Sequence, residues 1–274
     1  FHAQQDRKFN LSEPTPTIEA RDARDRVVEG DANYVEHLYR EECDGGWADG
    51  CYLPNATSSG GQPDQPPALN IGMVQIFLNP YHSGLAFVRE RQQTGGWDAV
   101  DELYAEYPDS TEQAIHPKKY PDDDPANLTV PDRSGEGWHP LRHNGTRAYS
   151  SVGEAGLFVS LWYPAFESRG TASIIPLQTH IIYNQTTREP ARPVTYNYDH
   201  PTTTGWDGDR LVPYVANDSD ETGYVYETAW DSPDDASEFA AGYRELLQYH
   251  DATAVDGRAD TYRIASGGFA DAFY

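Results

Sequence analysis

The chain has 274 residues, of which 44 are acidic and 20 are basic, so its formal net charge is −24. This charge excludes nucleic acid and anionic membrane surfaces as expected partners, because both bind basic patches that release counterions. Six tryptophans and 19 tyrosines exclude a disordered acidic chain. The sequence also contains no apolar run of roughly 18 residues, so we predict no membrane span.

The basic residues are almost all arginine, and Lys8, Lys118 and Lys119 are the only lysines. A folded, acidic, lysine-poor protein is typical of adaptation to high salt. Molar salt shortens the Debye length to roughly 3 Å, so the repulsion between surface carboxylates becomes tolerable. We therefore predict a halophilic source.

The first strong helical pattern runs from Ile18 to about Glu42, after a segment interrupted by Pro14. Apolar residues recur at helical spacing along it, and charged residues fill the other positions. Glu29 borders the apolar stripe, which would let it face a cleft. The alternative is an ordinary solvated charge.

Cys43 and Cys51 follow this helix and bracket a Gly- and Asp-rich turn, so we predict a disulfide between them, with two free thiols as the alternative. The chain also carries six Asn-x-Ser/Thr sequons. Their asparagines are Asn10, Asn55, Asn127, Asn144, Asn184 and Asn217. Together these features favour an extracellular or cell-surface protein that carries N-glycans.

The rest of the first half is predicted to be helical. The apolar run at 71–78 suits a helix or a strand, and we favour a helix that ends at Asn79-Pro80. Further predicted elements are helices at 83–92 and 97–107 with a break at Gly95-Gly96, then a turn capped by Ser110 that ends at His116-Pro117.

The second half mixes helices with strands after a long Asp-, Pro- and Gly-rich connection at 117–147. Its predicted elements are a helix at 153–166, strands at 210–215 and 223–230, a helix from Ser232 to about His250, and a hairpin pairing 261–265 with 269–274. The fold class is therefore α+β. We expect a mainly helical part, 1–150, and an α+β part, 151–274, packed on the same unit.

One set of residues suggests zinc chemistry. A zinc hydrolase needs three protein ligands, an open position for water, and a carboxylate that takes the proton of the water. Two histidines four residues apart on one helix and a carboxylate from a second helix supply these ligands. His2 is the candidate second histidine and Glu29 the candidate third ligand. The first histidine and the catalytic glutamate are expected upstream of residue 1.

This assignment rests on a resemblance. Phe1-His2-Ala3-Gln4-Gln5-Asp6 resembles the segment that follows H-E-x-x in a family of secreted, notably haloarchaeal, surface proteins with a gluzincin-like zinc-peptidase fold, and Val28-Glu29-Gly30-Asp31-Ala32 resembles the E-G-D-A helix of that family. Further similar motifs are Gly95 to Asp101, Ser110 to Pro117, Gly153 to Leu157 and Gly205 to Arg210. The departures are Gln4, where leucine is usual, and an apparent insertion at 170–204.

The resemblance implies two alternative functions. The chain as given favours a structural or assembly-forming surface protein, which associates with itself or with other surface proteins. The alternative is a secreted zinc endopeptidase in which His116 stabilises the oxyanion, although a histidine before a proline is more often structural. Whether the protein is an enzyme stays open. Asp207 and Asp209 are candidate ligands for Ca²⁺ or another cation on an acidic loop.

Overall fold

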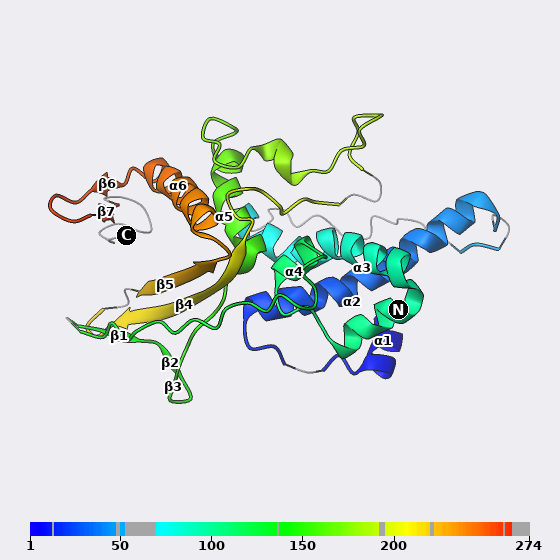
Figure 1. Ribbon diagram of the computed structural model, residues 1–274, viewed down its shortest axis with the longest axis horizontal. Coiled ribbons are helices and arrows are strands. Elements are labelled where there is room, and N and C mark those ends of the chain that lie inside the picture. Colours follow the sequence, from blue (N-terminus) through cyan, green and yellow to red (C-terminus); the bar gives the residue numbers. More distant parts are fainter. Residues whose placement is uncertain are drawn as a thin grey trace, which may run out of the picture.

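The computed structural model describes residues 1–12, 14–47, 50–52, 70–135, 137–191, 195–219, 222–259 and 261–264. It confirms the α+β class, with helices and small antiparallel sheets (Figure 1). The helices are α1 (His2–Phe9), α2 (Ile18–Gly45), α3 (Ile71–Ala105), α4 (Thr111–Ile115), α5 (Gly153–Glu167) and α6 (Pro233–Tyr249), with a 3₁₀ turn, η1, at Leu177–His180. The strands are β1 (Trp138–Pro140), β2 (Arg142–His143), β3 (Thr146–Arg147), β4 (Trp206–Ala216), β5 (Thr222–Trp230), β6 (Thr253–Ala254) and β7 (Tyr262–Arg263).

Helices α2 and α3 form the centre of the helical part. Arg26 of α2 bonds to Asn79 of α3, and Tyr34 bonds to Gln92 further along, so the two helices run in the same direction. Their apolar faces enclose a core cluster that also takes in α4. Burial of this cluster stabilises the long, highly charged α2 far more than helix propensity does.

Two glycines let α2 and α3 approach closely. A Cβ on Gly30 would lie 2.4 Å from the carbonyl carbon of Gly84, and a Cβ on Gly84 would lie 2.2 Å from the carbonyl oxygen of Arg26. Side chains larger than hydrogen do not fit at this crossing. It therefore fixes the orientation of Glu29 and Asp31, which flank Gly30 in the sequence.

Helix α3 corrects one prediction and fits another. The predicted end at Asn79-Pro80 is wrong, because Pro80 lies inside α3. Asn79 is buried and accepts a hydrogen bond from Arg26, so tertiary contacts hold the helix through the proline and compensate for the lost backbone hydrogen bond. The predicted break at Gly95-Gly96 is present, since Gly96 has φ 72° inside the assigned helix.

The C-terminal part is built on the β4–β5 hairpin, whose strands pair as the sequence predicts. β1 adds to the other edge of β4, so the strand order is β1-β4-β5. Helices α5 and α6 pack with residues of β5 in a second core cluster. Ser232 caps α6 and Pro233 begins it, as predicted.

The first strand of the last predicted hairpin also has a partner that the sequence did not indicate. In the described residues, Tyr262–Arg263 pairs with Thr253–Ala254, which follows α6. The short stretch between these two strands makes this pairing local. The predicted partner strand at 269–274 lies outside the described residues.

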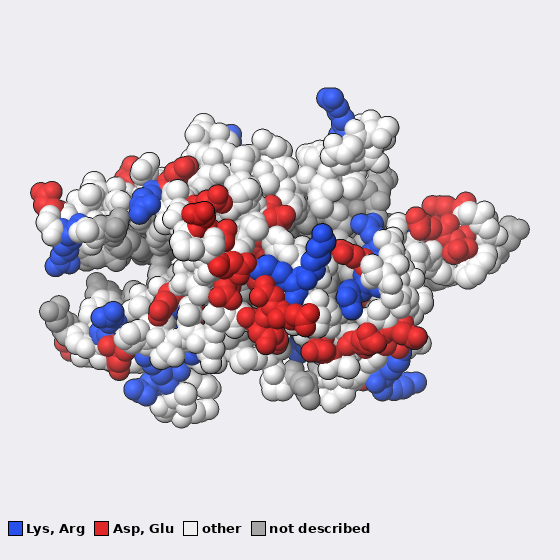
Figure 2. Space-filling model, viewed as in Figure 1, with Lys and Arg blue, Asp and Glu red and all other residues white. Residues whose placement is uncertain are grey.

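None of the described helices combines the length and apolar content needed to cross a bilayer. Acidic side chains gather near the middle of one face and on the end of α2 that stands away from the body (Figure 2). At that end Cys43 and Cys51 form the predicted disulfide.

Candidate metal sites

The two predicted zinc ligands lie together. His2 begins α1, Glu29 lies in the middle of α2, and the Nε2 atom of His2 is 3.3 Å from the Oε2 atom of Glu29. Glu29 is mostly buried while His2 is half-exposed, so the pair opens to solvent on the α1 side. Two atoms bound to one tetrahedral zinc at about 2.1 Å lie roughly 3.4 Å apart, so the observed separation suits a shared ion.

Gln5 orients the imidazole of His2. Its Nε2 atom donates to the backbone oxygen of Val28 at 2.9 Å, and lies 3.0 Å from Asp31 Oδ2 and 2.6 Å from the hydroxyl of Tyr104. These acceptors turn the other end of the amide, Oε1, towards His2 Nδ1 at 2.7 Å. Nδ1 therefore carries the proton in the neutral ring, and Nε2 presents its lone pair towards Glu29.

The Glu29 side of this pair is bordered by α3. Burial raises the pKa of the Tyr81 hydroxyl, and the charge of Glu29 with a hydrogen bond to it raises that pKa further. Asp31 is buried below, where burial raises the pKa of its carboxyl and the hydrogen bonds from Tyr104 and Gln5 oppose that rise. In Glu29-Gly30-Asp31, Glu29 thus offers the candidate ligand atom, Gly30 makes the helix crossing, and Asp31 supports Gln5.

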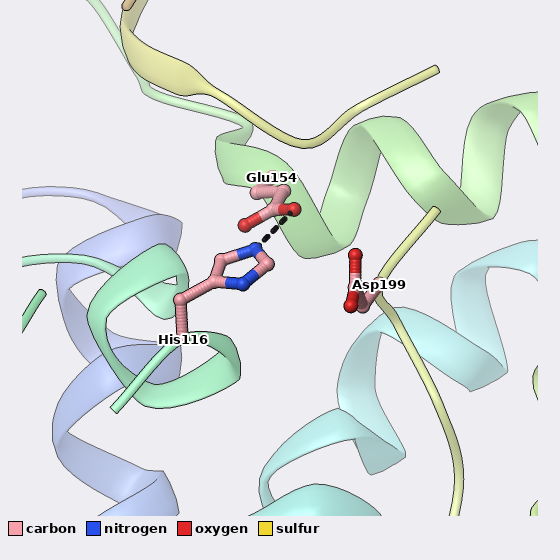
Figure 3. Close-up of side chains that lie close together, drawn as sticks. All are labelled: His116, Glu154 and Asp199. Atoms are coloured by element: carbon pink, nitrogen blue, oxygen red, sulfur yellow. Dashed lines mark hydrogen bonds and ion pairs between the residues drawn. The ribbon is translucent and has the colours of Figure 1, made fainter. Parts of the chain in front are cut away.

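A second group of ligand-type side chains lies elsewhere. His116 follows α4, Glu154 lies in the first turn of α5, and Asp199 lies before β4, yet one ligand atom from each falls within 4.8 Å of the others (Figure 3). His116 Nε2 is 3.0 Å from Glu154 Oε1. Glu154 is fully buried, His116 is partly buried, and Asp199 is exposed, so the group opens to solvent at Asp199.

Burial and the contact between Glu154 and His116 shift the pKa values of both side chains. Burial raises the pKa of Glu154 to about 7, although the hydrogen bond and charge of His116 oppose that rise. Burial acts against protonation of His116, but the hydrogen bond and charge of Glu154 outweigh it, and the pKa of His116 lies above its usual value.

A third acidic group already contains a cation. Glu112, Asp123 and Asp231 also bring carboxylate oxygens within 4.8 Å of one another, and the Nζ atom of Lys119 lies between 2.6 and 2.7 Å from all three. Their hydrogen bonds raise the pKa of Lys119 against the effect of burial, so the ammonium stays charged. This group is a salt-bridge network in which the ammonium of Lys119 already balances the carboxylates.

The remaining predicted sites have different outcomes. Asp209 accepts hydrogen bonds from the backbone nitrogens of Val152 and Gly153 at the start of α5 and from Trp206 Nε1, so it orients α5. No group of three ligand residues in the described part includes Asp209 or Asp207.

Five sequon asparagines are exposed, and Asn55 lies outside the described residues. The five are Asn10, Asn127, Asn144, Asn184 and Asn217.

The sequence singled out His116 but did not predict that it lies beside Glu154 and Asp199. Within the described part of the chain, no hydrogen bond or ion pair joins His116 to His2 or Glu29, so the structure gives no support for one shared centre. Asp199 was missed altogether, because it lies in the irregular segment at 170–204 and no periodicity marks it. Glu154 carried a signal, an acid in the first turn of a predicted helix, but this signal is common at helix starts.

Comparison with known proteins matches the second half of the chain to a family model. The model of a domain of unknown function, DUF8575, matches residues 140–274, from the end of β1 to the end of the chain. Glu154 and Asp199 fall inside that span, and His2, Glu29 and His116 fall before it. No curated protein and no solved structure matches the chain.

Proposed function

We propose that this chain is the body of a secreted zinc-peptidase-type protein of a halophile, in which His2 and Glu29 are two of the three zinc ligands. The observation that carries the proposal is the 3.3 Å separation of His2 Nε2 and Glu29 Oε2, two atoms from the consecutive helices α1 and α2. The donor set, one imidazole and one carboxylate, suits Zn²⁺, and Gln5 supports the imidazole as a neighbouring carbonyl or carboxylate does in zinc sites.

The chain would contribute binding and orientation to such a site. The remaining ligand and the general base come, in this proposal, from a His-Glu pair that precedes Phe1. Zinc in such a site acts as a Lewis acid and makes water a nucleophile near neutral pH. Tyr81 lies next to Glu29 and offers a hydroxyl with a raised pKa, which is suited to donating a hydrogen bond and not to giving up its proton.

The test is metal and activity analysis of the protein with its natural N-terminus, in molar KCl. Glu29→Gln should lose one zinc equivalent and reduce peptide cleavage by at least about 100-fold, because removing a ligand disrupts the metal site. Glu36→Gln is the matched control on the same helix, since Glu36 is exposed and forms an ion pair with Arg40. Equal zinc content in both variants would refute the assignment of Glu29.

A second candidate function is a glycosylated surface protein without catalysis. The observation that favours it is the exposure of all five described sequon asparagines. Mass analysis of the protein from its native source would reveal the glycans, and light scattering in molar salt would reveal self-association. Zinc binding together with peptide cleavage would favour the peptidase, whereas glycans and assembly without cleavage would favour the surface protein.

A further inference from the structure

The group of His116, Glu154 and Asp199 combines features that an ion-pair network does not require. Its three side chains come from three separate segments and converge on one small space, with Glu154 descending from α5 and Asp199 facing the imidazole from the segment before β4 (Figure 3). One nitrogen and two carboxylate oxygens form the kind of mixed donor set that binds a transition-metal dication. The ligand atoms lie within 4.8 Å of one another, so side-chain movements of about 1 Å would bring them to bonding distance of one ion.

A buried oxygen atom without a hydrogen-bond partner is a second, independent observation in favour of a bound ion. Glu154 is completely buried, and its Oε2 atom has no hydrogen-bond partner among the described residues. A buried carboxylate oxygen without a partner is unfavourable, and such atoms in folded proteins usually contact a water or an ion. Arg26 lies close enough to act on Glu154 through its charge, but no hydrogen bond joins them.

The exposed ligand is also held in position. The Oδ1 atom of Asp199 accepts a hydrogen bond from Thr204 Oγ1 at 2.8 Å, and the backbone nitrogen of Asp199 donates to Asn197 Oδ1 at 3.0 Å. Asn197 in turn donates to the backbone oxygens of Asp199 and Thr179. Outer hydrogen bonds of this type orient carboxylate ligands in metal sites.

The Lys119 network nearby shows the alternative arrangement. There three carboxylates receive a built-in ammonium at 2.6 to 2.7 Å. At His116 no lysine or arginine forms an ion pair with Glu154 or Asp199 in the described part of the chain, and His116 supplies only a titratable partner. A dication would balance the charge of the two carboxylates.

We propose that His116, Glu154 and Asp199 bind a transition-metal dication, with Zn²⁺ as the expected ion, at a site separate from the His2–Glu29 pair. The imidazole favours Zn²⁺ over Ca²⁺, which prefers a larger set of oxygen ligands. The site opens at Asp199, so an ion held there has room for a water or an anionic group from solvent. Because Glu154 and His116 join α5 to the end of α4, the ion would also stabilise the contact between the two parts of the chain.

The test is calorimetric titration of the chelator-stripped chain with Zn²⁺ and, separately, with Ca²⁺ in molar KCl, with Co²⁺ absorption as a spectroscopic probe. Asp199→Asn should weaken Zn²⁺ binding at this site by roughly tenfold or more, and His116→Gln by more than that. His143→Gln is the matched control, since His143 is exposed in β2. Circular dichroism of the metal-free variants checks folding, and the exposed Asp199 keeps the test valid should His116→Gln fail to fold.

His2→Gln separates this proposal from the proposed function. A zinc equivalent that is retained in His2→Gln and lost in His116→Gln and Asp199→Asn supports the second site. Zinc binding that is lost only in His2→Gln overturns it and leaves the peptidase-type site intact. Binding of Ca²⁺ alone, or a crystal structure after zinc soaking with only a water at Glu154 and no zinc anomalous signal, also overturns it.

Discussion

The two halves of helix α2 differ in how far their charged side chains are buried. In the N-terminal half, Glu19, Asp22, Arg26 and Asp31 are all buried. In the C-terminal half, charged residues from 36 onwards are mostly exposed and the helix stands away from the body (Figure 1). Both halves carry several charged residues, so the presence of charge does not by itself explain the difference.

Partners from other elements explain it. Arg26 donates to Asn79 of α3 and to the backbone oxygen of Thr111 in α4, and Glu19 accepts from the backbone nitrogen of Thr111. The ion pair of Arg40 with Glu36, in contrast, lies within the helix and in solvent. Asp22 differs, because it pairs with Arg21 of the same helix. Substitutions at the two ends of α2 test how much the contacts from other segments contribute.

The largest effect is expected for Arg26→Met. Removal of the guanidinium leaves the acceptors on Asn79 and Thr111 unpaired and removes the positive charge near Glu19, so we expect a loss of about 3 kcal/mol or more in the free energy of unfolding. Urea denaturation in molar KCl measures it. Arg40→Met should change the stability by no more than about 0.5 kcal/mol. Similar losses for the two arginines would contradict the comparison.

The next effect is expected at the helix crossing. Gly30→Ala places a Cβ 2.4 Å from the backbone of Gly84, which forces α2 and α3 apart and should cost about 2 to 3 kcal/mol. Gly45→Ala is the control in the same helix, because nothing lies within 4 Å of its Cβ position. We expect it to be neutral or to stabilise by up to about 1 kcal/mol, since alanine has the higher helix propensity. A harmless Gly30→Ala would mean that the helices are not in close contact.

The third prediction concerns pH. Burial raises the pKa of Glu19 from 4.5 to about 8, so the folded state keeps a proton that the unfolded state releases. Below both values the group has no effect. As the pH rises between them, stability should fall by up to about 1.4 kcal/mol per pH unit.

Glu19→Gln removes this titration while it keeps the side-chain oxygen that accepts from Thr111. Subtracting its stability curve from that of the wild type isolates the contribution of Glu19 from the other buried carboxyls. Glu36→Gln is the control on the same helix and should change the stability by no more than about 0.5 kcal/mol. A wild-type curve parallel to that of Glu19→Gln would rule out the raised pKa.

The smallest effect is expected for the Glu36–Arg40 pair. Both side chains are more than half exposed, and they lie four positions apart on the helix. A double-mutant cycle to alanine should give a coupling of about 0.3 to 0.5 kcal/mol that decreases with added salt. A coupling of several kcal/mol would show that this end of α2 is also held by tertiary contacts.

The candidate sites were predictable to different degrees. His2 and Glu29 carried a motif, and Cys43 and Cys51 carried a short spacing that restricts them to one another. Asp199 carried neither, because its position depends on how an irregular segment passes α4 and α5. Gln5 is the support of His2, yet in the sequence it is only one polar residue of a short helix.

The sequence by itself determined the local elements: the caps of α4 and α6, the strands of the hairpin, the break at Gly96, and the class of the fold. These depend on residues within a few positions of one another, whose backbone preferences act locally. Only the tertiary structure decided that α3 continues through Pro80, that β1 joins β4, and which carboxylates meet a cation. Those outcomes depend on contacts between segments distant along the chain, where the free energy of burying a polar group is set by the partner that the fold supplies.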